Sequence, residues 1–73
     1  MKPKNECKFA FINRGICLKN LKKFNEAIQN YDEAITLSQG ADVEDIYYFK
    51  GNCLLELNKF EEAILLYDQA IEL

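Results

Sequence analysis

The sequence predicts an all-α fold of four helices, arranged as two stacked antiparallel helix-turn-helix repeats. The first observation is a repeat: with a shift of 36 residues, 8–37 aligns with 44–73, and 14 of the 30 positions are identical. Apolar residues also recur at helical spacing, and no strand-like alternation occurs. Such self-similarity is typical of stacked arrays. We therefore expect one domain over residues 1–73, with repeat one at about 8–37, a loop at 38–42 and repeat two at about 43–73.

The first helix of each repeat is predicted at about residues 6–21 and 43–57. Each has a glycine near its middle, Gly15 and Gly51, where glycine costs about 1 kcal/mol relative to alanine. Because the two glycines occupy matching positions, they indicate a close approach between helices rather than flexibility.

The second helix of each repeat is predicted from one apolar stripe at helical spacing. In repeat one the stripe consists of Phe24, Ala27, Ile28, Tyr31, Ala34 and Ile35. In repeat two it consists of Phe60, Ala63, Ile64, Tyr67, Ala70 and Ile71. The small residues Ala27 and Ala63 are expected where the paired helices cross. A short turn precedes each second helix, and a capping-box variant is expected from Asn58 and Glu61.

The segment SQGAD connects the two repeats. Gly40 is expected to stop the helix before it, because glycine readily adopts the left-handed conformation found after helix ends. Asp42 is expected to cap the next helix, with Asp45 three residues on.

Charge and composition limit the classes of function. Residues 1–23 carry seven bases and one acid, a net +6, and residues 24–73 carry two bases and eleven acids, a net −9. This is not the pattern of a nucleic-acid binder. No apolar run is long enough to span a membrane and no signal peptide is evident, so we expect a cytoplasmic protein without a membrane partner.

Catalytic and metal-binding patterns are not found in this sequence. It has no histidine, no glycine-rich phosphate loop and no GxSxG motif, and its cysteines have no paired base. We therefore expect no enzyme activity and no catalytic, cofactor-binding or metal-binding residues. Cys17 and Cys53, at matching positions, are expected to be small buried residues.

The repeated residues resemble the tetratricopeptide repeat family, whose order is glycine, aromatic, alanine, aromatic, alanine. Here these are Gly15, Phe24, Ala27, Tyr31 and Ala34, and again Gly51, Phe60, Ala63, Tyr67 and Ala70. The period of 36 exceeds the family's usual ~34 residues, and the closing proline is replaced by Gln39. The resemblance implies stacked helical hairpins whose first helices line a concave surface that binds peptides or partner helices.

The residues that differ between the repeats are where function is expected. One side of each first helix is apolar beyond what packing requires. By the resemblance, it forms a groove for a partner protein or peptide, in which Asn13 and Asn52 bond the ligand backbone. The groove residues are Phe9, Ile12, Asn13, Ile16, Tyr48, Phe49, Asn52 and Leu55. Alternatively, the chain's own ends cover these residues, or they are single exposed apolar residues without meaning.

A second hypothesis concerns the last helix, where Leu65 and Leu66 stand at the positions of Gln29 and Asn30. Arrays need a polar cap, so these leucines are candidate contacts in a homo-oligomer, or the chain is a fragment of a longer array. The basic head and acidic tail favour head-to-tail stacking. RNA binding is a third alternative, suggested by the basic head and opposed by Asp45 and Glu56.

Overall fold

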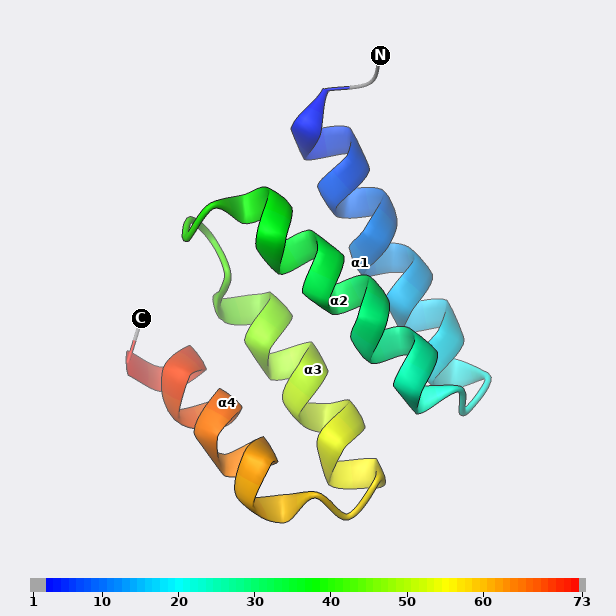
Figure 1. The fold of residues 1–73 in the computed structure, drawn as a ribbon, viewed down its shortest axis with the longest axis vertical. Coiled ribbons are helices and arrows are strands. Elements are labelled where there is room, and N and C mark those ends of the chain that lie inside the picture. Colours follow the sequence, from blue (N-terminus) through cyan, green and yellow to red (C-terminus); the bar gives the residue numbers. More distant parts are fainter. Residues whose placement is uncertain (1–2, 73) are drawn as a thin grey trace.

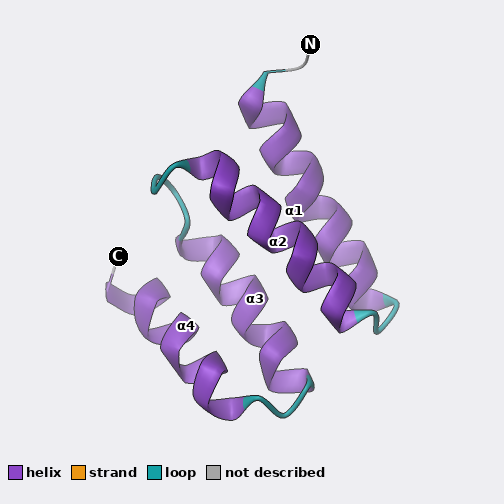
Figure 2. Cartoon of the chain, viewed as in Figure 1, coloured by secondary structure: helices purple, strands orange, loops and turns teal. Residues whose placement is uncertain are grey.

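The structure, a computed structural model, describes residues 3–72 as a succession of four α-helices (Figure 1). Their bounds are α1 Lys4–Asn20, α2 Phe24–Ser38, α3 Glu44–Glu56 and α4 Phe60–Glu72. No strand occurs in this part of the chain, and short turns join the helices (Figure 2). The predicted all-α fold of helical hairpins is confirmed. None of the described helices is both long and apolar enough to cross a membrane.

The helices follow one another across the molecule, so that α1 and α4 lie at opposite edges (Figure 1). α2 packs against both α1 and α3, whereas the described part of α4 packs against α3. The Cα atoms span 38 × 29 × 13 Å, which is thin enough that few side chains are fully enclosed. The buried cluster lies along the α2–α3 contact and contains Ala27, Tyr31, Ala34, Ile46 and Cys53.

Small residues occupy the positions where paired helices approach, as the sequence predicts. A Cβ atom added to Gly15 would lie 2.5 Å from a ring carbon of Tyr31, and one added to Gly51 would lie 2.7 Å from a ring carbon of Tyr67. Ala27 and Ala63 are also buried. The matched glycines therefore make room for the tyrosine of the same hairpin.

The predicted helix caps are partly wrong. Gln39 and Gly40 both have positive φ after α2, so the expected stop is found. Asp42, however, also has positive φ (51°), and Val43 directly precedes α3 without any side-chain cap bond. Asn58 lies two residues before α4, also with positive φ, so it cannot begin a capping box at Phe60.

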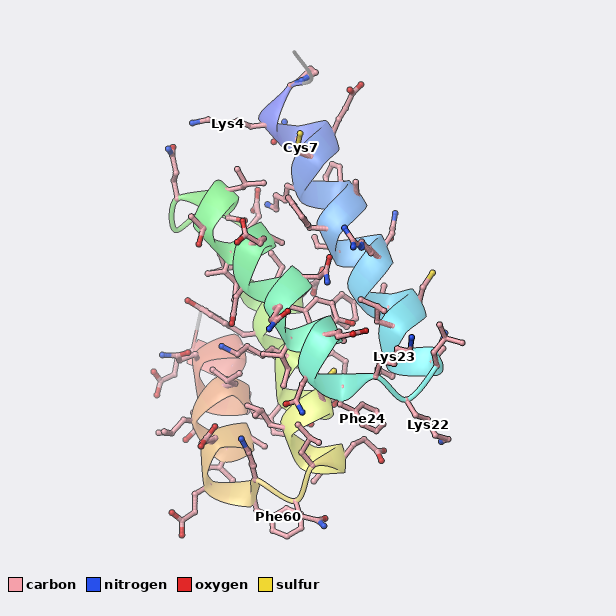
Figure 3. All side chains as sticks on the ribbon, turned by 45° about the vertical axis from the view of Figure 1, so that its right-hand side comes forward. Lys4, Cys7, Lys22, Lys23, Phe24 and Phe60 are labelled. Carbon is pink, nitrogen blue, oxygen red and sulfur yellow. The ribbon has the colours of Figure 1, made fainter. Side chains whose placement is uncertain are left out.

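Both hairpin turns instead share one backbone motif at the end of the first helix. Lys22 and Asn58 adopt the left-handed conformation, with φ of 64° and 63°. The next amide in each turn bonds back to the helix, from Lys23 to the Leu18 carbonyl at 2.8 Å and from Lys59 to the Leu54 carbonyl at 2.9 Å. This six-to-one bond defines a Schellman motif. Figure 3 shows Lys22 and Lys23 in the first of these turns.

The cysteine prediction holds for one position and fails for the other. Cys53 is buried in the α2–α3 contact, whereas Cys17 is exposed on α1, and both are free thiols. The reason is that α2 covers this face of α3, while no described helix covers the matching face of α1.

Candidate partner-binding surface

The eight predicted groove residues all lie on α1 and α3, the first helices of the two hairpins. We call them the first-helix surface. Three large apolar members are about half exposed: Phe9 at 56%, Tyr48 at 52% and Leu55 at 45%. Asn13 is exposed, and the other four members, Ile12, Ile16, Phe49 and Asn52, are half-buried. The surface therefore combines exposed aromatic and aliphatic side chains with partly covered ones.

Three of the half-buried members pack against the core. Ile12, Ile16 and Phe49 contact the buried cluster, and the Phe49 ring stacks on Tyr31 with centroids 5.9 Å apart and an interplanar angle of 28°. Stacked aromatic pairs at this separation stabilise a contact beyond the area that they bury. These residues therefore join the first-helix surface to the core and present only part of their side chains.

Tyr48 lies in a small aromatic and polar cluster of the second hairpin. Its ring centroid is 5.9 Å from that of Phe49 and 6.0 Å from that of Tyr67 on α4. The Tyr67 hydroxyl donates a hydrogen bond of 2.5 Å to Oδ1 of Asn52. Burial raises the pKa of Tyr67, so this hydroxyl keeps its proton at neutral pH. The cluster restricts the positions of Tyr48 and Asn52 before any ligand binds.

The same site in the first hairpin is apolar. Tyr31 is fully buried, and among the described residues its hydroxyl has no hydrogen-bond partner. Ile16 stands 36 residues before Asn52, where an amide would be needed to bond this hydroxyl. Burial, with smaller effects of the nearby Cys53 and Cys17, raises the pKa of Tyr31 to about 12.

Two contributors were not found from the sequence. Tyr67 looked like a scaffold residue because it is identical in both repeats, although the Ile16/Asn52 difference could have signalled its bond. Lys8 was not singled out from the sequence, and it is buried. Its Nζ lies 5.9 Å from the Phe9 ring centroid and donates to the backbone oxygen of Asp42 at 3.5 Å. A cation therefore lies beside the exposed Phe9.

α4 exposes more apolar surface than the two leucines singled out from the sequence. Leu65 is exposed and Leu66 half-buried. The stripe residues Ile64 and Ile71 are 58% and 80% exposed. Phe60 is exposed as well, beside the α3–α4 turn (Figure 3). The assignment of Leu65 and Leu66 to an oligomer contact stays a prediction.

Within 3–72, no group of three or more histidine, cysteine or acidic residues is placed to hold a metal ion. Burial raises the pKa of the Cys53 thiol, which keeps it protonated, and the protonated thiol is a poor nucleophile.

Comparison with known protein families gives a match over most of the chain. The family model described as Tetratricopeptide repeat matches residues 9–73, which include all four helices in whole or in large part. Neither the curated proteins nor the solved structures give a significant match to this chain.

Proposed function

The chain belongs to the tetratricopeptide repeat family, and from this premise we propose that it is a protein–protein interaction module. Repeats of this family are typically non-catalytic scaffold modules. In this proposal the first-helix surface binds a single peptide or amphipathic helix of a partner protein. The observation that supports it most is the half-exposure of Phe9, Tyr48 and Leu55 on the first helices. The division into one domain of two repeats and the cytoplasmic location stay predictions from the sequence.

The exposed side chains would supply the binding free energy. Aromatic residues dominate protein interfaces because they bury a large area at a small cost in conformational entropy. Tyr48 is restrained by Phe49 and Tyr67, so little further ordering is required when a ligand contacts it. Apolar side chains of the ligand would pack on Phe9, Tyr48 and Leu55, and the half-buried Ile12 and Ile16 would add to the apolar area.

Polar contacts would set the ligand's register. The Tyr67 bond orients the Asn52 side chain with its amide oxygen toward Tyr67, so we expect the Asn52 NH2 group to donate to a ligand backbone carbonyl. Asn13 is exposed and can bond through either end of its amide. Charge differs along the surface, with Lys19 on α1 and the exposed Asp45 and Glu56 on α3. We therefore expect the ligand to place acidic residues near α1 and basic residues near α3.

Selection of peptides from a random 12-residue library against the purified protein tests the proposal. Bound peptides should shift the backbone amide signals of α1 and α3 around Phe9, Tyr48 and Leu55. Replacing Tyr48 or Leu55 by alanine should weaken a selected peptide by about tenfold or more, as is typical of anchors at the centre of an interface. Ile64→Ala on α4 is a matched control, because Ile64 is 58% exposed but lies off this surface. Equal losses in all three variants, or signal changes on α4 alone, would exclude the first-helix surface as the binding site.

A second candidate function is that of a structural unit that associates with itself. The exposed Ile64, Leu65 and Ile71 on α4 favour it, because several large apolar side chains exposed on one helix are a common mark of an interface. RNA binding remains the third alternative, and retention of single-stranded RNA at physiological salt would favour it over both.

A further inference from the structure

The α2–α3 contact shows how one hairpin packs on the next. From α3, Ile46 and Cys53 are buried in the cluster with Ala27 and Tyr31 of α2. Phe49 stacks on Tyr31, and Lys50 Nζ lies 2.6 Å from a carboxylate oxygen of Asp32. The contact is therefore an apolar centre with one ion pair at its side.

α1 carries the same positions as α3, but no described helix covers them. The residues 36 positions before the α2-facing side of α3 are all exposed, and we call them the α1 edge face: Ala10, Asn13, Arg14 and Cys17. Their counterparts Ile46, Phe49, Lys50 and Cys53 are buried or half-buried.

α4 in turn carries the same positions as the α3-facing side of α2. Ile28 and Ile35 of α2 pack against the buried cluster, whereas their counterparts Ile64 and Ile71 are 58% and 80% exposed. We call the corresponding residues the α4 edge face: Phe60, Ile64, Tyr67, Asp68 and Ile71. The two uncovered faces are thus the two halves of the contact that α2 and α3 make within the chain.

Both members of the ion pair are retained on these faces. Arg14 is the basic residue at the position of Lys50, and Asp68 repeats Asp32. Arg14 and Asp68 are both exposed. The helices that carry them are also opposite in charge: α1 has four bases and one acid, and α4 has four acids and no base. The two faces are therefore complementary in charge as well as in position.

We propose that the α4 edge face binds the α1 edge face of a second copy of this chain, in the geometry of the α2–α3 contact. In this arrangement Arg14 of one copy pairs with Asp68 of the other. The inference rests on the second candidate function, self-association, and specifies its geometry. Because each copy carries one face of each kind, the contact is head to tail and extends to further copies.

The intermolecular contact is weaker than the contact that it copies. Ala10 and Asn13 stand where α3 has Ile46 and Phe49, so the α1 edge face offers less apolar area. The charge pair then contributes a larger share of the specificity, and association should weaken as salt rises.

Sedimentation velocity from micromolar to millimolar protein, at low and at physiological salt, tests the proposal. The protein should form dimers and longer species as concentration rises. Arg14→Glu and Asp68→Lys should each weaken the association constant by about tenfold, since each places like charges opposite one another. Both changes in one chain should restore association to within about threefold. An equimolar mixture of the two single variants should likewise assemble, because the introduced glutamate of one then meets the introduced lysine of the other.

Controls separate the possible failures. Glu26→Lys changes the net charge as Asp68→Lys does, at an exposed position of α2, and should leave association intact. Circular dichroism establishes that each variant is folded. A protein that stays monomeric at every concentration overturns self-association itself. Association that is indifferent to both charge reversals overturns the proposed geometry but not self-association. The first-helix surface is tested separately by the peptide selection, although Asn13 belongs to both surfaces.

Discussion

Tyr31 and Tyr67 hold the same position in the two hairpins, yet the first is fully buried and the second only half-buried. The isoleucines four residues further on differ in the same direction, since Ile35 packs against the core and Ile71 is 80% exposed. The cause is that α2 lies between α1 and α3, while α4 is covered by α3 on one side. In a repeat array, the stability of each unit depends on its neighbours as well as on its own residues.

The hydroxyl groups extend this comparison. Tyr67 donates to Asn52, whereas Tyr31 meets Ile16 at the matching position and has no described partner. An unsatisfied buried hydroxyl is costly, so the better-packed hairpin has the poorer hydrogen bonding. In the first hairpin the tyrosine is thus held by shape and apolar contact, and in the second it is also held by a polar bond near the surface.

Among the substitutions considered, the glycine-to-alanine changes should give the largest difference in stability between the two hairpins. In Gly15→Ala the new methyl group would meet the enclosed Tyr31 ring, and overpacking of this kind costs about 3 kcal/mol. The better helix propensity of alanine offsets about 1 kcal/mol of this cost, so we expect a net loss of about 2 kcal/mol in the free energy of unfolding. In Gly51→Ala the Tyr67 ring is less enclosed and can move, and the better helix propensity of alanine offsets about 1 kcal/mol. We expect a net loss below about 1 kcal/mol there. Urea unfolding measures both, and equal losses would contradict the proposed difference in packing.

Alkaline pH should destabilise the first hairpin through Tyr31. Its hydroxyl keeps its proton to about pH 12 in the folded protein, against an ordinary pKa of 10.0. The unfolded chain therefore loses the proton first. The free energy of unfolding therefore keeps its full value below pH 10, and the Tyr31 hydroxyl lowers it by about 2–3 kcal/mol as the pH rises from 10 to 12.

Tyr31→Phe should remove that part of the pH dependence of unfolding. Tyr67→Phe is the matched control, and it should remove less, because Tyr67 is nearer the surface. Free energies of unfolding measured from pH 9 to pH 12 for both variants test this. Identical pH profiles would contradict the attribution of the alkaline loss of stability to Tyr31.

At neutral pH the same two substitutions should have opposite signs. Tyr67→Phe removes the bond to Asn52 and should cost about 1 kcal/mol. Tyr31→Phe removes a buried hydroxyl without a described partner and should leave stability unchanged or raise it by up to about 1 kcal/mol. A loss of stability in Tyr31→Phe equal to that in Tyr67→Phe would mean that Tyr31 has a partner after all.

The smallest expected effect is a transfer of the polar contact from one hairpin to the other. Ile16→Asn places an amide at the position that Asn52 holds in the second hairpin, and by this equivalence we expect the amide to reach the Tyr31 hydroxyl. The loss of apolar contact makes the single substitution unfavourable. A double-mutant cycle with Tyr31→Phe should nevertheless show a favourable coupling of about 0.5–1 kcal/mol between the introduced amide and the hydroxyl. Zero coupling would show that the two hairpins place this tyrosine differently.

Local patterns predicted the helices and the close approach at Gly15 and Gly51, because helical spacing and repetition are properties of the chain itself. The caps at Asp42 and Asn58 were predicted wrongly. Both residues adopt positive φ, and the choice between a cap and a left-handed turn depends on where the preceding helix ends. The first-helix surface was chosen from residues that differ between the repeats, and its binding role stays a prediction.

The order of residues was enough to define two hairpins of one kind, since each forms from contacts between residues close in the chain. It was not enough to predict that the same residue would be exposed in one repeat and buried in the other. Cys17 is exposed and Cys53 buried, although they hold matching positions. Burial depends on which helix lies alongside, and that arrangement exists only once the hairpins have packed, because apolar area leaves water through contact with a neighbour.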